Sequence, residues 1–243
     1  MHTLTSASLA TSPAVRALTG PGGYLMPARE LSALLGVEAT DWARFGTHWH
    51  DLTLDTHMAD GGTYRFRRYG QFDVDATTGT LTPLPHAPYV QESTINPLNG
   101  GVERHFDPLT EGFTSDPLLR SLLLTMAALF TAAEGTSAWN IKLRPYRITA
   151  GEDQAGQPAP EGRHRDGVTF ITSLMIDRCN VAGGESAVYD NDGRELLTTT
   201  LADPGDLLLG DDRRTLHSVT PLSPVDATAP AHRDVLVVAF TER

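Results

Sequence analysis

Two histidines and one aspartate in the second half of the chain have the types and spacing of metal ligands. His164 and Asp166 stand two positions apart in the stretch Gly162–Gly167, and His217 follows in a later segment. In an extended strand, residues i and i+2 point the same way, so His164 and Asp166 can occupy two neighbouring positions on one ion. Two histidines with one carboxylate are the ligand set of non-haem Fe(II) oxygenases. A single H-x-D tripeptide is common, however, and the prediction of a metal site depends on the surrounding pattern.

Arg233 adds a candidate anion-binding group to this pattern. Three protein ligands on one face of an octahedral ion leave up to three positions open, which a bidentate 2-oxo acid and dioxygen would fill. Arg233 begins the last predicted strand, and its planar guanidinium is suited to bind a carboxylate such as the distal group of 2-oxoglutarate. Taken alone, Arg233 would be a surface residue at a strand end, but the three ligands together favour the cosubstrate role.

The segment that must position these residues has the pattern of short strands separated by turns. Turn signals at Asn96–Gly101, Asp190–Gly193 and Asp203–Asp206 interrupt segments rich in β-branched and aromatic residues. The predicted strands are 63–69, 139–148, 168–176, 183–189, 195–201, 207–209, 216–220 and 233–240. Short strands at regular spacing indicate a sandwich or a barrel.

Helices are expected to flank this β region. Residues 1–60 are predicted to form a mostly helical N-terminal layer, with one helix beginning at Ser12-Pro13 and another beginning at Pro27 and ending at Gly36. The longest helix is predicted near 118–133, and because its apolar residues cover more than one face we expect it to be buried against a sheet. No break in composition divides the chain, so we expect one domain over 1–243, with its β core in 61–243.

The composition narrows the classes of partner. The net charge of -11 argues against nucleic acid and against an anionic membrane surface. Cys179 is the single cysteine, so an intrachain disulfide is excluded, and we expect a packed small residue rather than a nucleophile there. There is no pattern of a signal peptide, and cytoplasm is the expected compartment. The sequence leaves the oligomeric state open.

Several other polar residues are candidates for substrate contact. Arg65, Arg67 and Arg68 form a small basic patch, which is either a solvated strand face or the source of an anchor for a substrate carboxylate, with Arg67 as our candidate. Loop residues often determine specificity. The loop-like candidates, which could instead satisfy turn backbone groups, are Gln91, Ser93, Asn96 and Arg104.

Two further groups have more than one interpretation. His48, His50 and His57 could suggest a second metal site with strand-like spacing, but no carboxylate pattern supports it and we favour a structural role. Arg144 lies on one side of a predicted strand and Arg147 on the other, and either side could line the barrel.

The ordered set of motifs resembles the bacterial 2-oxoglutarate/Fe(II) dioxygenases that hydroxylate free L-amino acids, of which isoleucine 4-hydroxylase is an example. The residues that carry the resemblance are Gln91–Ser93, Asn96–Leu98, Gly100–Arg104, His164–Gly167, Gly183–Ser186, Asp211–Arg214, His217–Pro221 and Arg233–Leu236. The resemblance implies a mainly β protein with flanking helices (α+β) and a double-stranded β-helix, or jelly-roll, core. It also implies that His164, Asp166 and His217 hold Fe(II) and that Arg233 binds 2-oxoglutarate. The Pro221–Pro230 loop before Arg233 is longer than in many dioxygenases.

These observations predict an Fe(II)- and 2-oxoglutarate-dependent dioxygenase that uses O2 to hydroxylate an aliphatic C–H bond. The expected substrate is a free L-amino acid or a similar small polar metabolite, with succinate and CO2 as coproducts. Two alternatives remain: a jelly-roll metalloenzyme of another class, such as a hydrolase or isomerase using Zn(II) or Mn(II), and a non-catalytic cupin-like binding module.

Overall fold

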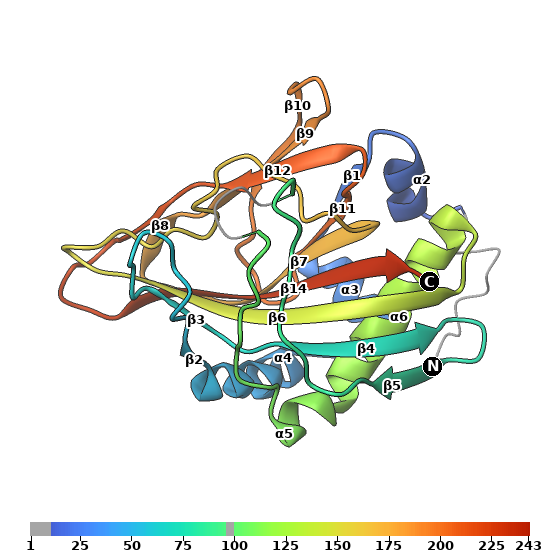
Figure 1. Cartoon of the computed structure of the whole chain (residues 1–243), viewed down its shortest axis with the longest axis horizontal. Helices are drawn as coiled ribbons and strands as arrows, with labels where there is room; N and C mark the ends of the chain where they lie inside the picture. The colour runs from blue at the N-terminus through green and yellow to red at the C-terminus, as the bar shows by residue number, and fades with distance from the viewer. Residues whose placement is uncertain (1–10, 96–99) are drawn as a thin grey trace.

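The computed structural model describes residues 11–95 and 100–243, and its centre is one large antiparallel sheet. The strands are β1 (Gly23–Met26), β2 (Thr53–Leu54), β3 (Arg65–Arg67), β4 (Gly70–Asp75), β5 (Thr80–Pro83), β6 (Ala138–Ala150), β7 (Phe170–Cys179), β8 (Val181–Gly183), β9 (Glu185–Asp190), β10 (Glu195–Thr200), β11 (Leu207–Asp211), β12 (Thr215–Val219), β13 (Leu222–Pro224) and β14 (Ala231–Glu242). The large sheet has the order β1-β11-β7-β14-β6-β3-β2, and β4 and β5 extend it beside the other half of β6. A smaller sheet, β10-β9-β12, and the pair β13-β8 lie over it (Figure 1).

The helices cover the opposite face of the large sheet. They are α2 (Pro13–Thr19), α3 (Ala28–Leu35), α4 (Ala39–Gly46), the 3-10 helix η1 (Thr47–Asp51), α5 (Glu111–Thr114) and α6 (Pro117–Glu134). The longest, α6, begins after Asp116, whose side chain accepts the Leu118 N–H, and ends at Gly135 in the left-handed conformation. Figure 1 shows α3, α4 and α6 behind the sheet. The jelly-roll core with flanking helices therefore confirms the predicted fold class.

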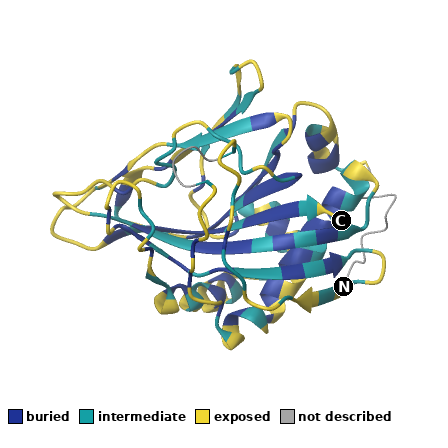
Figure 2. Ribbon diagram, in the orientation of Figure 1, coloured by how far each residue is buried: buried dark blue, intermediate teal, exposed yellow. Residues whose placement is uncertain are grey.

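The hydrophobic core lies between α6 and the large sheet. Leu119, Leu122 and Leu123 of α6 are completely buried, and Phe130 stacks on Phe170 of β7 with ring centroids 4.3 Å apart. In Figure 2 the buried colour follows the central strands and the sheet-facing side of α6. By length and composition α6 is also apolar enough to cross a membrane. In this fold its apolar residues instead fill the core, as those of a central helix do.

The other face of the large sheet carries a cationic surface because of the strand register. Arg178 of β7, Arg233 of β14, Ile148 of β6 and Arg65 of β3 are cross-strand neighbours in one row. Since side chains alternate along a strand, the next inward row lies two residues further along β14, β6 and β3 and ends at Arg67. On β7 the step is three residues, because the register with β14 shifts there. That row is Met175, Val235, Tyr146 and Arg67. This face forms the floor of the cavity described below.

Two local predictions differ from the structure. Gly23–Met26 forms an edge strand, β1, within the predicted helical layer, where it pairs with β11. The segment around His48 and His50 is a 3-10 helix that continues directly from α4, so the strand-like spacing of these histidines does not correspond to a strand. Cys179 is exposed at the end of β7, so the prediction of a packed residue was wrong. It is the last residue of the strand, beyond the region where the sheet is covered.

Candidate metal centre and cavity

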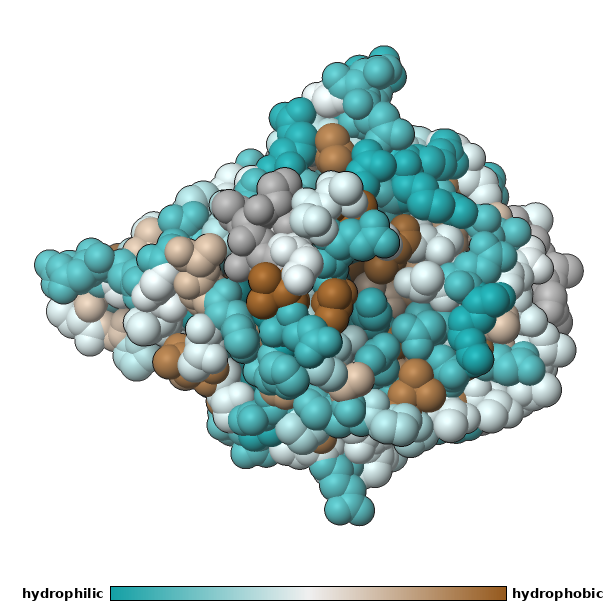
Figure 3. Space-filling view, viewed as in Figure 1, coloured by the Kyte–Doolittle hydropathy of each residue, from teal (hydrophilic) through white to brown (hydrophobic). Residues whose placement is uncertain are grey.

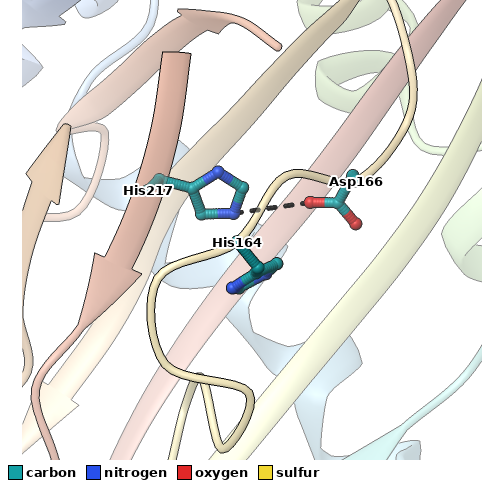
Figure 4. Close-up of side chains that lie close together, drawn as sticks. All are labelled: His164, Asp166 and His217. Carbon is teal, nitrogen blue, oxygen red and sulfur yellow. Dashed lines mark ion pairs between the residues drawn. The ribbon is translucent and has the colours of Figure 1, made fainter. Parts of the chain in front are cut away.

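His164, Asp166 and His217 meet between the loop that precedes β7 and strand β12 (Figure 4). A short antiparallel bridge joins the two histidines, since the His164 N–H donates to the His217 carbonyl at 3.0 Å and the reverse bond is 2.8 Å. One candidate ligand atom from each of the three residues lies within 4.8 Å of the other two. The structure therefore brings all three predicted ligands to one point. His217 lies in β12, but His164 and Asp166 are not in a common strand, because His164 forms an isolated bridge and Asp166 lies in a loop.

The contacts of the two rings indicate which nitrogen of each histidine is available to a metal. The Nδ1 atom of His164 lies 2.9 Å from the Gly162 carbonyl, so a proton on Nδ1 leaves Nε2 as a free electron-pair donor. The Nε2 atom of His217 lies 3.4 Å from Oδ2 of Asp166. Two neighbouring ligands of one ion, each with a bond of about 2.1 Å, would be roughly 3 Å apart, so this spacing fits a shared metal.

Arg144 of β6 orients the carboxylate of Asp166. Its Nη1 atom donates to Oδ1 of Asp166 at 2.6 Å and to the hydroxyl of Tyr89 at 2.9 Å. Burial raises the pKa of Asp166, but the charges of Arg144 and His217 outweigh it and hold the pKa well below its usual value. The pKa of His217 is raised, because Asp166 outweighs the effect of burial. Asp166 is therefore a carboxylate with one oxygen fixed by Arg144 and the other facing the histidines.

Asp212 holds the backbone of the turn that carries Asp166. Its carboxylate accepts N–H groups from Asp166, Gly167 and Val168 at 3.0, 2.7 and 3.0 Å. Gly167 has a φ of 77°, and a Cβ there would lie 2.9 Å from the Ile95 side chain. The conformation of the turn therefore requires glycine at position 167. It also requires the Asp212 carboxylate, which accepts the backbone N–H groups of the turn.

Arg233 lies in the same cavity and has the properties of an anion site. The side chain is 1% exposed, and its Nε and Nη2 atoms are buried without a hydrogen-bond partner in the described part of the chain. Burial and the nearby charge of Arg178 lower the pKa of Arg233 to about 10. Gly184 leaves room here, since a Cβ would lie 2.9 Å from Nη1 of Arg178 and 3.3 Å from Cδ of Arg233. His232 points elsewhere and lies 2.9 Å from Asp177.

The cavity also collects most of the predicted substrate residues. It encloses about 1100 Å³, including open solvent at its mouth, and contains all three candidate ligands and Arg233. Arg67, Gln91 and Arg104 line it, and Nη2 of Arg104 donates to Oε1 of Gln91 at 2.8 Å. Ser93 is exposed and is not part of the lining, and Asn96 lies outside the described residues. Figure 3 shows a mostly hydrophilic face with hydrophobic surface gathered near its middle.

The structure also decides between the alternative interpretations of Arg144 and Arg147 and of the histidines near residue 50. Arg144 faces the cavity, whereas Arg147 faces outward and forms a bidentate ion pair with Asp234 at 2.8 and 2.6 Å. His48 contacts Asp116 at 3.0 Å. Within residues 11–95 and 100–243, the only other group of potential metal ligands is Asp177, His232 and Asp234, so the histidines near residue 50 form no such group.

Sequence reasoning missed the roles of Asp212, Arg144 and Arg178. Asp212 had a signal, since it lies in the Asp211–Arg214 motif, but an acidic turn gives no sign of which N–H groups it accepts. Arg144 was identified only as one of two possible inward residues. Arg178 had no signal, because its pairing with Arg233 depends on the register of β7 and β14.

Fold and site together define a jelly-roll protein with a two-histidine, one-carboxylate centre and a cationic cavity. Residues 46–239 match the family model described as 2OG-Fe dioxygenase. The chain belongs to this family and is a 2-oxoglutarate-dependent dioxygenase, whose cofactors are Fe(II), 2-oxoglutarate and O2. The donor set of two imidazoles and a carboxylate fits Fe(II).

Particular relatives place it more closely within the family. It is 28% identical over 199 residues to the 3(1)-hydroxy-L-isoleucine 4-dioxygenase of Pantoea ananatis, covering 79% of this chain and 77% of that protein. It is 24% identical over 157 residues to the L-isoleucine-4-hydroxylase of Bacillus thuringiensis, covering 63% of this chain and 65% of that protein. A crystal structure of a bsmA homolog from Methylobium petroleophilum PM1 superposes with a TM-score of 0.87 at 36% identity, covering 94% and 92% of the two chains.

Proposed function

We propose that the protein hydroxylates an aliphatic C–H bond of a free L-amino acid while converting 2-oxoglutarate and O2 to succinate and CO2. In this proposal His164, Asp166 and His217 hold Fe(II), and Arg233 binds the distal carboxylate of 2-oxoglutarate. When bound, the iron with its cosubstrates supplies the oxidant that replaces hydrogen by hydroxyl at the C–H bond. The names of the two relatives, which refer to L-isoleucine and to a hydroxylated L-isoleucine, support the substrate class.

The residues around the metal site aim its three donors at one ion. The bond from Arg144 to Oδ1 of Asp166 leaves Oδ2 directed toward His217, which favours binding through a single carboxylate oxygen. The backbone bridge fixes the spacing of the two histidines. Because each donor is held before an ion arrives, little ordering is required on binding.

The surroundings of Arg233 support its assignment as the binding residue for 2-oxoglutarate. Its guanidinium is buried beside a second guanidinium, that of Arg178, and the two nitrogens of Arg233 that lack partners remain available. A carboxylate would neutralise the charge of Arg233, reduce its repulsion by Arg178 and accept two parallel hydrogen bonds. The apolar side chains of Val188, Leu208 and Val235 line the same cavity and reduce access of water to the bound cosubstrate.

One observation carries the proposal: three ligand atoms within 4.8 Å of one another share a cavity with a buried, unpartnered arginine. The test is succinate release across a panel of free L-amino acids with Fe(II), ascorbate and 2-oxoglutarate. We expect stimulation by one or a few aliphatic amino acids. The variants His164→Ala and Asp166→Ala should lose amino-acid-dependent succinate formation. Full activity in either would contradict the ligand assignment, and no turnover on any amino acid would contradict the substrate class.

A further inference from the structure

Arg67 of β3 is a buried cation that the fold itself leaves without a counterion. Its side chain is 2% exposed, and the Nε and Nη2 atoms are buried and make no hydrogen bond within the described part of the chain. Burial lowers the pKa of Arg67 to about 10, so the guanidinium remains protonated at neutral pH. Leaving a charge buried without a partner is strongly unfavourable. A site of this kind is expected where a bound anion completes it.

The neighbouring arginines of the cavity do have protein partners. Arg65 donates to Oδ2 of Asp55 at 2.8 Å, and Arg144 donates to Asp166 at 2.6 Å. Arg104 donates to the amide oxygen of Gln91. Arg67 therefore differs from the arginines beside it on β3 and across β6, and the difference is specific to one side chain rather than a property of a generally basic surface.

Aromatic rings hold Arg67 in a fixed orientation. Its guanidinium carbon lies 3.6 Å from the ring centroid of Phe106, 4.8 Å from that of Tyr146 and 5.4 Å from that of Tyr89. Ring contacts of this kind cover the flat face of a guanidinium and leave its edge, where the N–H donors lie, for a planar carboxylate. The arrangement thus presents a rigid bidentate site to the cavity.

The strand register places this site apart from Arg233 and near the metal ligands. Arg67 is the cross-strand neighbour of Tyr146, whereas Arg233 is the neighbour of Ile148 on the opposite side of β6. Arg144, which holds Asp166, lies two residues from Tyr146 along the same strand, a rise of roughly 7 Å. An aliphatic chain of a few carbons can cover this separation.

We propose that Arg67 anchors the α-carboxylate of the amino-acid substrate. The side chain of the substrate then extends past Tyr146 toward Asp166 and His164. This inference rests on the function proposed above and specifies which end of the substrate is recognised. It requires an unmodified carboxylate, so an amino-acid amide should be a poor ligand. Arg233, on the far side of β6, remains available for 2-oxoglutarate.

The test compares Arg67→Met with the wild type and with Arg29→Met, an exposed arginine of α3 that serves as the control. L-isoleucine and L-isoleucinamide are titrated by calorimetry and in the succinate assay. A hydrogen bond to a charged group corresponds to roughly 10- to 100-fold in affinity. We expect the wild type to prefer the acid by about this factor, Arg67→Met to lose the preference, and the affinity for 2-oxoglutarate to be unchanged.

Thermal unfolding of the ligand-free protein separates binding from a structural role. Because Arg67→Met removes an uncompensated buried charge, its melting temperature should equal or exceed that of the wild type. A lower melting temperature, or an unchanged preference for the acid over the amide, would overturn the assignment. If the wild type binds and converts no free amino acid, the proposed function fails, and the melting temperature of Arg67→Met alone then decides whether Arg67 is an anion site.

Discussion

Replacing Asp212 by alanine tests whether the proposed metal ligand Asp166 is positioned through its backbone. The Asp212 carboxylate accepts three N–H groups, from Asp166, Gly167 and Val168. Each bond to a charged group contributes about 1.5–3 kcal/mol, so the three together are worth roughly 5–9 kcal/mol before offsets. Burial and the charge of Asp166 raise the pKa of Asp212, which shows that the carboxylate is itself partly unfavourable there. Gly167 is exposed, so water can replace one bond.

After these offsets we expect Asp212→Ala to lower the free energy of unfolding by about 3 kcal/mol, which is roughly 6–12 °C in melting temperature for a chain of this size. Because the turn also sets the position of Asp166, the affinity for Fe(II) should fall about 10- to 100-fold. Calorimetry measures the first effect, and anaerobic titration with Fe(II) measures the second. Asp192→Ala, in the exposed turn between β9 and β10, is the control. If Asp212→Ala melts within about 1 °C of the wild type and binds Fe(II) equally well, the backbone-positioning argument is wrong.

Three further predictions concern other charged side chains. Arg233→Met should raise the KM for 2-oxoglutarate roughly 100-fold by removing two charge-assisted bonds, and an unchanged KM would exclude the assignment. Arg178→Met should raise the same KM about tenfold without altering that of the amino acid, since it removes the second cation beside the anion site; equal effects on both would indicate a general disruption. Asp116 has a pKa below its usual value, because its bonds to Arg44 and His48 outweigh the effect of burial. Its contribution to stability is therefore present above the unfolded pKa and lost as pH falls through the folded one. Asp116→Asn should cost about 1 kcal/mol at pH 7, and the difference in melting temperature should disappear under acid; a constant difference from pH 7 to 3 would contradict this.

Local signals made much of the fold predictable. The long helix α6 had an N-cap aspartate followed by proline, apolar residues on more than one face and a terminal glycine, and all of these act within the helix itself. The hairpin between β9 and β10 was likewise marked by its turn, Asp190–Gly193. Strand β1 lacked such a signal. Its four residues become a strand only because they pair with β11, which lies far along the chain. Short segments of this kind depend on tertiary contacts.

The site likewise contains residues that could be predicted from the sequence and residues whose role depends on the fold. The residues His164, Asp166 and His217 could be proposed because ligand chemistry restricts which residue types hold iron. Alternation along β6 separated Arg144 from Arg147, but the choice between the two faces required knowing which side α6 covers. Only the folded sheet shows that Arg144 points into the cavity. The orienting groups of a site are therefore less visible in a sequence than its ligands, since they act through register and backbone bonds.

Two buried arginines of the cavity each have two donor nitrogens without a protein partner in the described part of the chain, and these two could each bind one acid of the proposed reaction. The chain as a whole is acidic, with a net charge of -11. Yet its cavity contains several buried arginines, and the fold neutralises some of them itself, as Asp55 does for Arg65 and Asp166 does for Arg144. Of the other buried arginines in the described cavity, Arg104 donates to the neutral amide of Gln91, whereas Arg67 and Arg233 each have two nitrogens, Nε and Nη2, with no hydrogen-bond partner. One carboxylate of 2-oxoglutarate and one of an amino acid would complete both, on opposite sides of β6. The acidic exterior is thus compatible with two small acids as ligands, because local partners rather than net charge determine what the cavity can bind.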